Sequence, residues 1–174
     1  FPALSGVLDV VYNPARTALL MQAERLGIPC AGGLYMLVSQ AKRSSELFMG
    51  KTIADSEIDR IEKVLKAQMQ NIVIIGMPGS GKSTVSAMLA EKLGRQVEDA
   101  DVLIAQKGGM SITEIFATQG ESGFRKLETE VLAEVGKKSG IVISTGGGCV
   151  TVPDNYRLLH QNGIIVWREK NINY

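Results

Sequence analysis

The run Gly76-Met77-Pro78-Gly79-Ser80-Gly81-Lys82-Ser83-Thr84 decides the fold of most of this chain. It fits the pattern G-x-x-x-x-G-K-[ST], in which the amides of a glycine-rich loop surround phosphate oxygens. Residues 71–75 before it are apolar and β-branched, which predicts a buried parallel strand. Residues 85–93 after it repeat apolar side chains at helical spacing. Strand, loop and helix together predict a nucleoside triphosphate site, and a chance glycine-rich turn is the alternative.

The chemistry of this loop indicates its ligands. Lys82 would reach the β- and γ-phosphates, the Ser83 hydroxyl would ligate Mg²⁺, and the positive end of the following helix would favour the phosphate charge. We therefore expect ATP and Mg²⁺ as cofactors. The residues expected to hold them are Gly79, Ser80, Gly81, Lys82, Ser83 and Thr84.

Composition narrows the function classes. The 19 Lys and Arg residues nearly balance the 18 Asp and Glu residues, so we expect no nucleic-acid partner. No apolar run approaches the roughly 20 residues of a membrane span, so we expect no membrane partner and a cytoplasmic location. The start at Phe1 lacks Met and a signal-peptide pattern, which indicates a piece of a longer protein. Cys30 and Cys149 have no metal-site spacing, and we interpret them as buried or incidental thiols.

The chain divides near residues 66–70. Residues 1–68 predict a strand over 7–12 and helices over 17–26, 34–49 and 55–70. The helix over 34–49 carries too much apolar surface to stand alone in water, so self-association through these exposed N-terminal helices is a further expectation.

Residues 69–174 alternate strands and helices. Strands are predicted over 96–98, 141–143 and 164–167, and helices over 111–116, 120–138 and 153–161. The spacing of Ser111 and Glu114 predicts a cap for the first of these helices. The expected fold class is α/β, a doubly wound parallel sheet of the P-loop kinase type, preceded by a mainly helical fragment of a Rossmann-type domain. Ligands of such sheets lie beyond the carboxyl ends of the strands, so the loops after the strands should line one crevice.

Those loops carry polar groups. Asp99 and Asp101 could act unequally, one near Mg²⁺ and the other accepting a proton from the attacking hydroxyl. The alternative is that Asp101 only caps the next helix. Residues 145–148, Thr-Gly-Gly-Gly, indicate backbone pressed against a ligand or a plain flexible turn. No Asp ends this strand, which favours a small-molecule kinase over motors and switches.

A cation on the long predicted helix completes the set. Arg125 could bind a substrate carboxylate while Glu128, one turn later, holds its guanidinium. The alternative is a solvated surface pair.

Taken together, residues 71–167 resemble the shikimate kinases. The resemblance rests on G-M-P-G-S-G-K-S-T, D-A-D, I-F-A-T-Q-G-E-S-G-F-R-K-L-E and S-T-G-G-G in this order. It implies ATP-dependent phosphorylation of the 3-hydroxyl of shikimate. It also implies that Asp99 lies near the metal, that Lys82 and Asp101 are catalytic, and that Asp101 binds the shikimate hydroxyls. The substrate would further be held by Arg125, Gly147 and Gly148.

Residues 1–50 resemble the carboxyl-terminal end of shikimate dehydrogenases, through D-V-V-Y-N-P-A-R-T-A-L-L and G-G-L-Y-M-L-V-S-Q-A. By this likeness Tyr12 and Gln40 would touch shikimate, and Val10 and Gly33 would touch NADP in the complete dehydrogenase. The implied parent is a dehydrogenase fused to a kinase.

The resemblance also breaks at both ends. The dehydrogenase's catalytic Lys and Asp and its dinucleotide loop should lie upstream, and the kinase's lid, its arginines and its last strand should follow Trp167. We therefore expect nucleotide binding with poor turnover. Two alternatives are another P-loop small-molecule kinase, such as a gluconate-kinase-like enzyme, and a non-catalytic nucleotide-binding or docking fragment.

Overall fold

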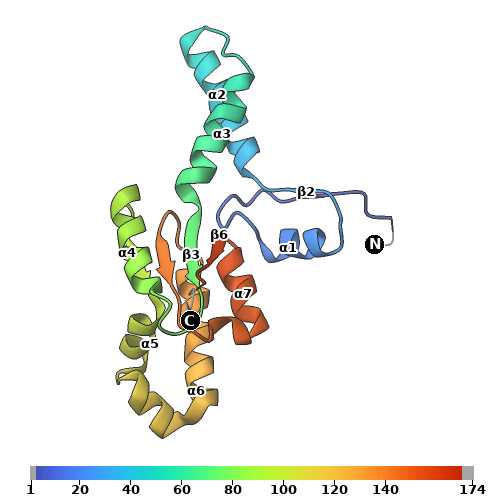
Figure 1. Ribbon diagram of the computed structural model, residues 1–174. Helices are drawn as coiled ribbons and strands as arrows, with labels where there is room; N and C mark the ends of the chain where they lie inside the picture. Colours follow the sequence, from blue (N-terminus) through green and yellow to red (C-terminus); the bar gives the residue numbers. More distant parts are fainter. Residues whose placement is uncertain (1–2, 170–174) are drawn as a thin grey trace. The chain divides into compact units, whose positions relative to one another are not determined.

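The computed structural model describes residues 3–169, which form two compact units that divide between Met69 and Gln70 (Figure 1). The ends of the sequence that bear on the expected longer parent, Phe1 and Tyr174, lie outside the described residues. Each unit is described by itself below.

The first unit begins with a small parallel β-α-β arrangement. Strands β1 (Val7–Leu8) and β2 (Cys30–Ala31) pair in parallel, and helix α1 (Ala18–Arg25) connects them. The helix prediction for this stretch is confirmed, but the predicted strand over 7–12 is too long and β2 was not predicted. The strand ends at Leu8, because the next residue, Asp9, turns the chain: its carboxylate accepts hydrogen bonds from the Val11 amide, at 3.0 Å, and the Thr17 hydroxyl, at 2.6 Å.

Two helices complete this unit, α2 (Leu34–Met49) and α3 (Ser56–Met69), as the apolar spacing predicted. They pack through Leu34, Val38 and Ile58, with Leu65 and Met69 alongside. Glu46 holds the connection between them. It accepts the Ile53 amide at 2.9 Å and pairs with Lys42 at 3.0 Å, and these bonds lower the pKa of Glu46 to about 2.

The second unit is a parallel sheet in the order β4-β5-β3-β6. Its strands are β3 (Asn71–Ile75), β4 (Val97–Asp99), β5 (Val142–Ser144) and β6 (Gly163–Trp167). Its helices are α4 (Lys82–Leu93), α5 (Ala100–Gly108), α6 (Ile112–Val135) and α7 (Pro153–His160), with a 3₁₀ turn η1 (Cys149–Thr151). The predicted α/β fold with a parallel sheet is therefore confirmed.

Alternating side chains of β3 and β5 bury both faces of this sheet. Ile74 and Val142 pack with Ala90 of α4 on one face. On the other face Val73 and Ile143 pack with the buried side of α6 and α7. Figure 1 shows α4 and α7 on opposite sides of the strands. This continuous burial holds the loop after β3 in a fixed place.

Helix α6 joins two helices that were predicted separately. Gly120 lies inside it at φ 67° and ψ −175°, a conformation that breaks the helical path without ending the element. The predicted cap at Ser111 is confirmed: its hydroxyl accepts the Glu114 amide, and Glu114 accepts the Ser111 amide at 2.8 Å. The break turns the first segment of α6 relative to the segment that carries Arg125.

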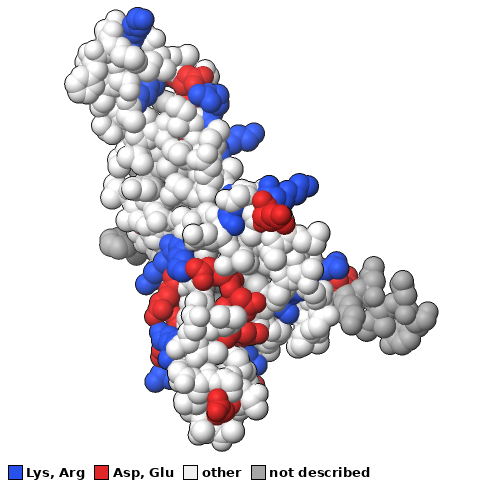
Figure 2. All heavy atoms as spheres, turned by 90° about the vertical axis from the view of Figure 1, so that its left-hand side faces the viewer, with Lys and Arg blue, Asp and Glu red and all other residues white. Residues whose placement is uncertain are grey.

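The surface agrees with the balanced charge count. Figure 2 shows Lys and Arg interspersed with Asp and Glu over one face of the molecule. Within residues 3–169, every helix falls short of the length or apolar character needed to cross a bilayer.

A buried asparagine fixes the base of β3. Asn71 is fully buried, donates its Nδ2 to the Lys138 carbonyl at 2.6 Å, and accepts the Ile141 amide on Oδ1 at 3.1 Å. Both bonds join β3 to the loop that leads into β5. The side chain therefore satisfies backbone groups that water cannot reach.

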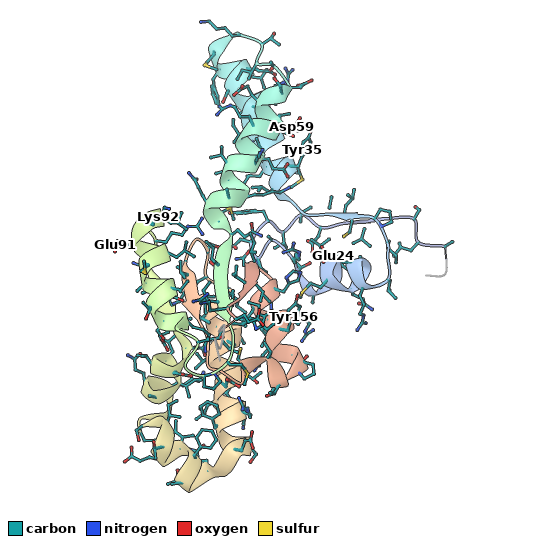
Figure 3. The ribbon with its side chains drawn as sticks, in the orientation of Figure 1. Glu24, Tyr35, Asp59, Glu91, Lys92 and Tyr156 are labelled. Atoms are coloured by element: carbon teal, nitrogen blue, oxygen red, sulfur yellow. The ribbon has the colours of Figure 1, made fainter. Side chains whose placement is uncertain are left out.

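We predict that Asn71→Leu lowers the free energy of unfolding of this unit by about 2–4 kcal/mol, because it leaves these buried backbone groups unpaired. Urea unfolding followed by the fluorescence of Trp167, the single tryptophan, measures the change. The control is Glu91→Ala at the exposed C-terminal end of α4 (Figure 3), which should leave the midpoint unchanged. Equal midpoints for Asn71→Leu and the control would contradict the role of Asn71.

Candidate functional site

The loop after β3 has the geometry of an anion cradle. Gly79 and Gly81 have φ of 72° and 81°, conformations that side-chain-bearing residues rarely adopt. Gly81 is the N-cap of α4 and makes no side-chain cap bond, so the first amides of the helix keep their donors for a ligand. The predicted strand-loop-helix context is confirmed, and the alternative of a chance turn is not supported.

Two buried side chains fit a phosphate in this loop. Lys82 is 8% exposed, and its Nζ donates to the Met77 carbonyl at 2.9 Å across the loop, which leaves two further donors on the ammonium. The Ser80 hydroxyl is buried without a hydrogen-bond partner among the described residues. An anion with several acceptor oxygens would satisfy both groups.

A second corner of the site brings together three elements. The Ser83 hydroxyl of α4 donates to Asp99 Oδ2 of β4 at 3.2 Å and lies 3.4 Å from the Ser144 hydroxyl of β5. The oxygens of Ser83, Asp99 and Ser144 suit a hard cation such as Mg²⁺ that takes its remaining ligands from phosphate and water. Within residues 3–169 no group of three His, Cys, Asp or Glu side chains could hold a metal without such outside ligands. Ser144 is a residue that the sequence reasoning missed, although it is a polar side chain at the carboxyl end of a strand.

The helix cap in this region is Asp99 rather than Asp101. Asp99 Oδ1 accepts the amides of Asp101 and Val102, at 3.0 and 3.4 Å, at the start of α5. The alternative that Asp101 only caps the helix is thus wrong, because the cap position is filled two residues earlier. The Asp101 carboxylate remains available for another role.

The Thr-Gly-Gly-Gly turn is closely contacted by three other parts of the unit, although Gly147 and Gly148 are only partly buried. The Thr145 hydroxyl donates to the Ile74 carbonyl at 3.0 Å, which ties the turn to the end of β3. A methyl group built on Gly146 would lie 2.7 Å from Asp101 Oδ1, and one on Gly147 would lie 2.5 Å from Pro78 Cγ of the glycine loop. One on Gly148 would lie 2.7 Å from Arg125 Nη2. The turn is therefore a close-packed junction and not a flexible connection.

Arg125 completes this junction from α6. Its Nη1 donates to Glu128 Oε2 at 2.8 Å, its Nη2 lies 3.5 Å from Glu121 Oε1, and its guanidinium stacks over Phe124 at 5.3 Å. Glu128 is fully buried, so the pair is not the solvated surface pair of the alternative. A paired guanidinium whose edge faces Gly148 is oriented for a planar anion such as a carboxylate.

The electrostatics of Asp101 suit a proton acceptor. The residue keeps contact with solvent, but its carboxylate lies against Gly146. Partial burial and then the negative charge of Asp99 raise the pKa of Asp101 above its ordinary value, while the positive charge of Lys82 opposes the rise. A carboxylate with a raised pKa is a stronger base than a free aspartate.

The predicted residues of the first unit lie on its own loops and helices. A methyl group on Gly33 would lie 1.9 Å from the Val10 carbonyl oxygen, so the backbones of Val10 and Gly33 are in close contact. Tyr12 is 46% exposed, and Gln40 donates to the exposed Ser44 hydroxyl at 2.9 Å. Their proposed ligands remain untested predictions.

Comparison with known proteins agrees with this geometry. A sequence model of the family described as "Shikimate kinase" matches residues 78–173. A shikimate kinase of a Synechococcus species is 48% identical over 102 residues, which cover 59% of this chain and 52% of the relative. One from a Sulfurihydrogenibium species is 45% identical over 105 residues, covering 60% and 63%. The chain spans about half the length of the curated relatives it matches.

Solved structures give the same result. The shikimate kinase from Acinetobacter baumannii in complex with shikimate matches with a TM-score of 0.57 and 43% identity, over 59% of this chain and 57% of that one. The enzyme from Aquifex aeolicus matches with a TM-score of 0.55 and 38% identity, over 57% and 63%.

We predict that Gly147→Ala displaces the glycine loop, because the new methyl group would overlap the Pro78 ring and its backbone nitrogen. The affinity for an ATP analogue should fall about tenfold and stability by about 1–3 kcal/mol, as overpacking typically costs. Isothermal titration calorimetry and thermal unfolding measure the two effects. Val150→Ala, an exposed position just after the same turn, is the control. Unchanged nucleotide affinity in Gly147→Ala would show that the contact with Pro78 does not matter.

Proposed function

Because the chain belongs to the shikimate kinase family, we propose that its second unit binds ATP and shikimate. The reaction is transfer of the γ-phosphoryl group of ATP to the 3-hydroxyl of shikimate, a step on the route to chorismate. The observation that carries this proposal is the junction around residues 146–148. One turn contacts the glycine loop, the Asp101 carboxylate and the Arg125 guanidinium, so phosphate and substrate groups share one place.

The nucleotide belongs in the glycine loop. The amides of Gly79, Ser80 and Gly81 and the first turn of α4, through Lys82 to Thr84, would hold the phosphates. The Lys82 ammonium would donate to phosphate oxygens, either in place of its hydrogen bond to the Met77 carbonyl or in addition to it. Ser83, with Asp99 nearby, would hold Mg²⁺, which supplies charge neutralisation on the phosphates when bound.

The substrate belongs on the other side of the same turn. Asp101 would bind the shikimate hydroxyls and accept the proton of the 3-hydroxyl, a role that its raised pKa supports. The Arg125 guanidinium, held by Glu128, would bind the carboxylate, and the backbone of Gly147 and Gly148 would close on the ring. Another acid such as gluconate could also use an arginine for its carboxylate and a carboxylate base, so only the relative placement of these two groups favours shikimate. Binding assays with both acids therefore separate this reading from the other small-molecule kinases.

We further propose that residues 1–50 are the end of a shikimate dehydrogenase, and that the natural protein joins both enzymes. The parallel β1-α1-β2 arrangement and the tight contact of Val10 with Gly33 support a Rossmann-type origin. Tyr12 and Gln40 would then contact shikimate, and Val10 and Gly33 would contact NADP in the complete protein. The intact mass of the natural protein tests this, since a mass near the 18.7 kDa of this chain leaves no room for a dehydrogenase.

Self-association is proposed through α2. At its end Leu47, Phe48 and Met49 are 69%, 89% and 55% exposed. Apolar side chains that are this exposed favour burial against another protein surface. Sedimentation equilibrium of the chain with and without Phe48→Ser decides between monomer and dimer.

We predict that Lys82→Ala abolishes measurable binding of ATP, because the loop loses its only buried ammonium among the described residues. Lys92→Ala removes an equal charge from the far end of α4 (Figure 3) and should leave binding intact. Calorimetric titration with ATP and Mg²⁺ measures both variants. Equal affinities would refute nucleotide binding in this loop and favour a docking fragment.

We predict that Asp101→Asn lowers phosphoryl transfer about 10²–10⁴-fold, the usual contribution of a general base. The base acts in its ionised form, so the wild-type rate should rise with pH through the raised pKa of Asp101. The same shift means that the fold favours the neutral carboxyl, so the variant should unfold at a higher temperature at pH 7. A single-turnover assay with protein in excess and a thermal scan give the two values. A variant with the wild-type rate and pH profile would rule out Asp101 as the base.

A further inference from the structure

A fully buried asparagine of α7 connects the parts of the junction from behind. Asn155 is 0% exposed and donates its Nδ2 to the Cys149 carbonyl at 2.9 Å, with Glu128 Oε2 at 3.4 Å. Its Oδ1 accepts the Thr129 hydroxyl at 2.8 Å. One amide thus reaches α6 twice and the first residue of η1 once, and each of its polar atoms has a partner.

The partners of Asn155 are those that orient Arg125. Glu128 Oε2 accepts both the Arg125 guanidinium and the Asn155 amide, while its Oε1 is buried without a hydrogen-bond partner among the described residues. A buried carboxylate with so few donors depends on each of them to keep its position, because water cannot replace a lost bond. Cys149 directly follows Gly148, whose backbone lies against the Arg125 guanidinium. Asn155 therefore helps to fix the Arg125 guanidinium through the Glu128 carboxylate on one side and the Gly148 backbone on the other.

We propose that Asn155 is a positioning residue for Arg125, which holds the Glu128 carboxylate in place and the guanidinium aimed at the substrate carboxylate. This inference rests on the proposed function of the site, since the orientation of the Arg125 guanidinium matters for function only if Arg125 binds the substrate carboxylate. Asn155 does not touch the substrate. It acts only through Glu128 and the Gly148–Cys149 backbone.

The Arg125 guanidinium itself provides a readout that needs no activity. In protein labelled with ¹⁵N-arginine, a guanidinium held by a carboxylate rotates slowly about its Nε–Cζ bond and gives separate Nη signals at low temperature. Arg125→Lys identifies the signals. We expect separate Nη signals in the wild type and one averaged signal in Asn155→Leu, while Tyr156→Phe, the next residue on α7 (Figure 3), keeps the wild-type pattern.

A second variant distinguishes positioning from plain structural support. In Asn155→Asp the new carboxyl can donate to Glu128 only when protonated, so it replaces the amide at low pH and repels Glu128 at high pH. The other ionisable groups of this network are Arg125, Glu121, whose carboxylate lies 3.5 Å from Arg125 Nη2, and the Cys149 thiol, whose pKa burial raises. We expect Asn155→Asp to show separate Arg125 signals near pH 5 and averaged signals near pH 8, with an unchanged amide spectrum elsewhere. Separate signals in both variants at both pH values would overturn the proposal, as would a loss in Asn155→Asp that does not depend on pH.

Shikimate titrations then separate this inference from the proposed function. In the wild type, shikimate should shift the Arg125 signals, and Asn155→Leu should weaken its binding about tenfold or more, as expected for a lost bond to a charged group. ATP affinity should stay within about twofold in the same variant, because the glycine loop keeps its own partners. If shikimate leaves the wild-type signals unmoved, the proposed substrate site fails, while the guanidinium signals of the unliganded protein still decide the role of Asn155.

Discussion

The absence of side chains at residues 146–148 is the constraint on which the site depends. Three groups from three elements approach the same short backbone: the Pro78 ring, the Asp101 carboxylate and the Arg125 guanidinium. A methyl group on Gly147 would overlap the rigid Pro78 ring, and one on Gly146 or Gly148 would force the Asp101 carboxylate or the Arg125 guanidinium to move away. Thr145 fixes the turn to the end of β3 by its hydroxyl, and the packed sheet holds that end in place. The small size of residues 146–148 is therefore what allows the charged groups of the site to lie close together.

The charges at this junction are costly for the fold, and their arrangement indicates function. Lys82 and Glu128 are both almost fully buried, yet each is incompletely paired within the described residues: Lys82 donates to a carbonyl, and Glu128 Oε1 accepts nothing. A fold selected for stability alone would replace such groups with apolar side chains, because desolvation exceeds the gain from a partial pair. Lys82 instead lies in the loop where phosphate is proposed to bind, and Glu128 pairs with the arginine that is proposed to bind a carboxylate. The incompletely paired buried groups and the raised pKa of Asp101 are the cost of a site prepared for ligands.

Sequence patterns could predict what depends on local chemistry. The glycine loop, the long helices and the capping box at Ser111 follow from residue types at short spacing, and the structure confirms them. The two-residue strand β2 could not be predicted, since its pairing with β1 depends on a partner more than twenty residues away and not on its own two residues. The strand over 7–12 was predicted too long because the residue types in the sequence cannot reveal that the Asp9 carboxylate accepts the Val11 amide and the Thr17 hydroxyl. Asn71 and Asn155 gave no signal, because a buried amide matters only through backbone groups that the fold brings to it.

The two aspartates at the start of α5 have different roles: because Asp99 caps the helix, the Asp101 carboxylate is not needed as a cap. Asp99 uses one oxygen to cap α5 and the other to accept the Ser83 hydroxyl, so its carboxylate is held in place at the proposed metal corner. At Asp101 partial burial and the negative charge of Asp99 raise the pKa, and the positive charge of Lys82 opposes the rise. Two carboxylates separated by one residue thus have different surroundings: Asp99 accepts hydrogen bonds on both oxygens, and Asp101 is partly buried against Gly146. A pair divided in this way can hold a cation with one member and accept a proton with the other, which neither could do if both had the same environment.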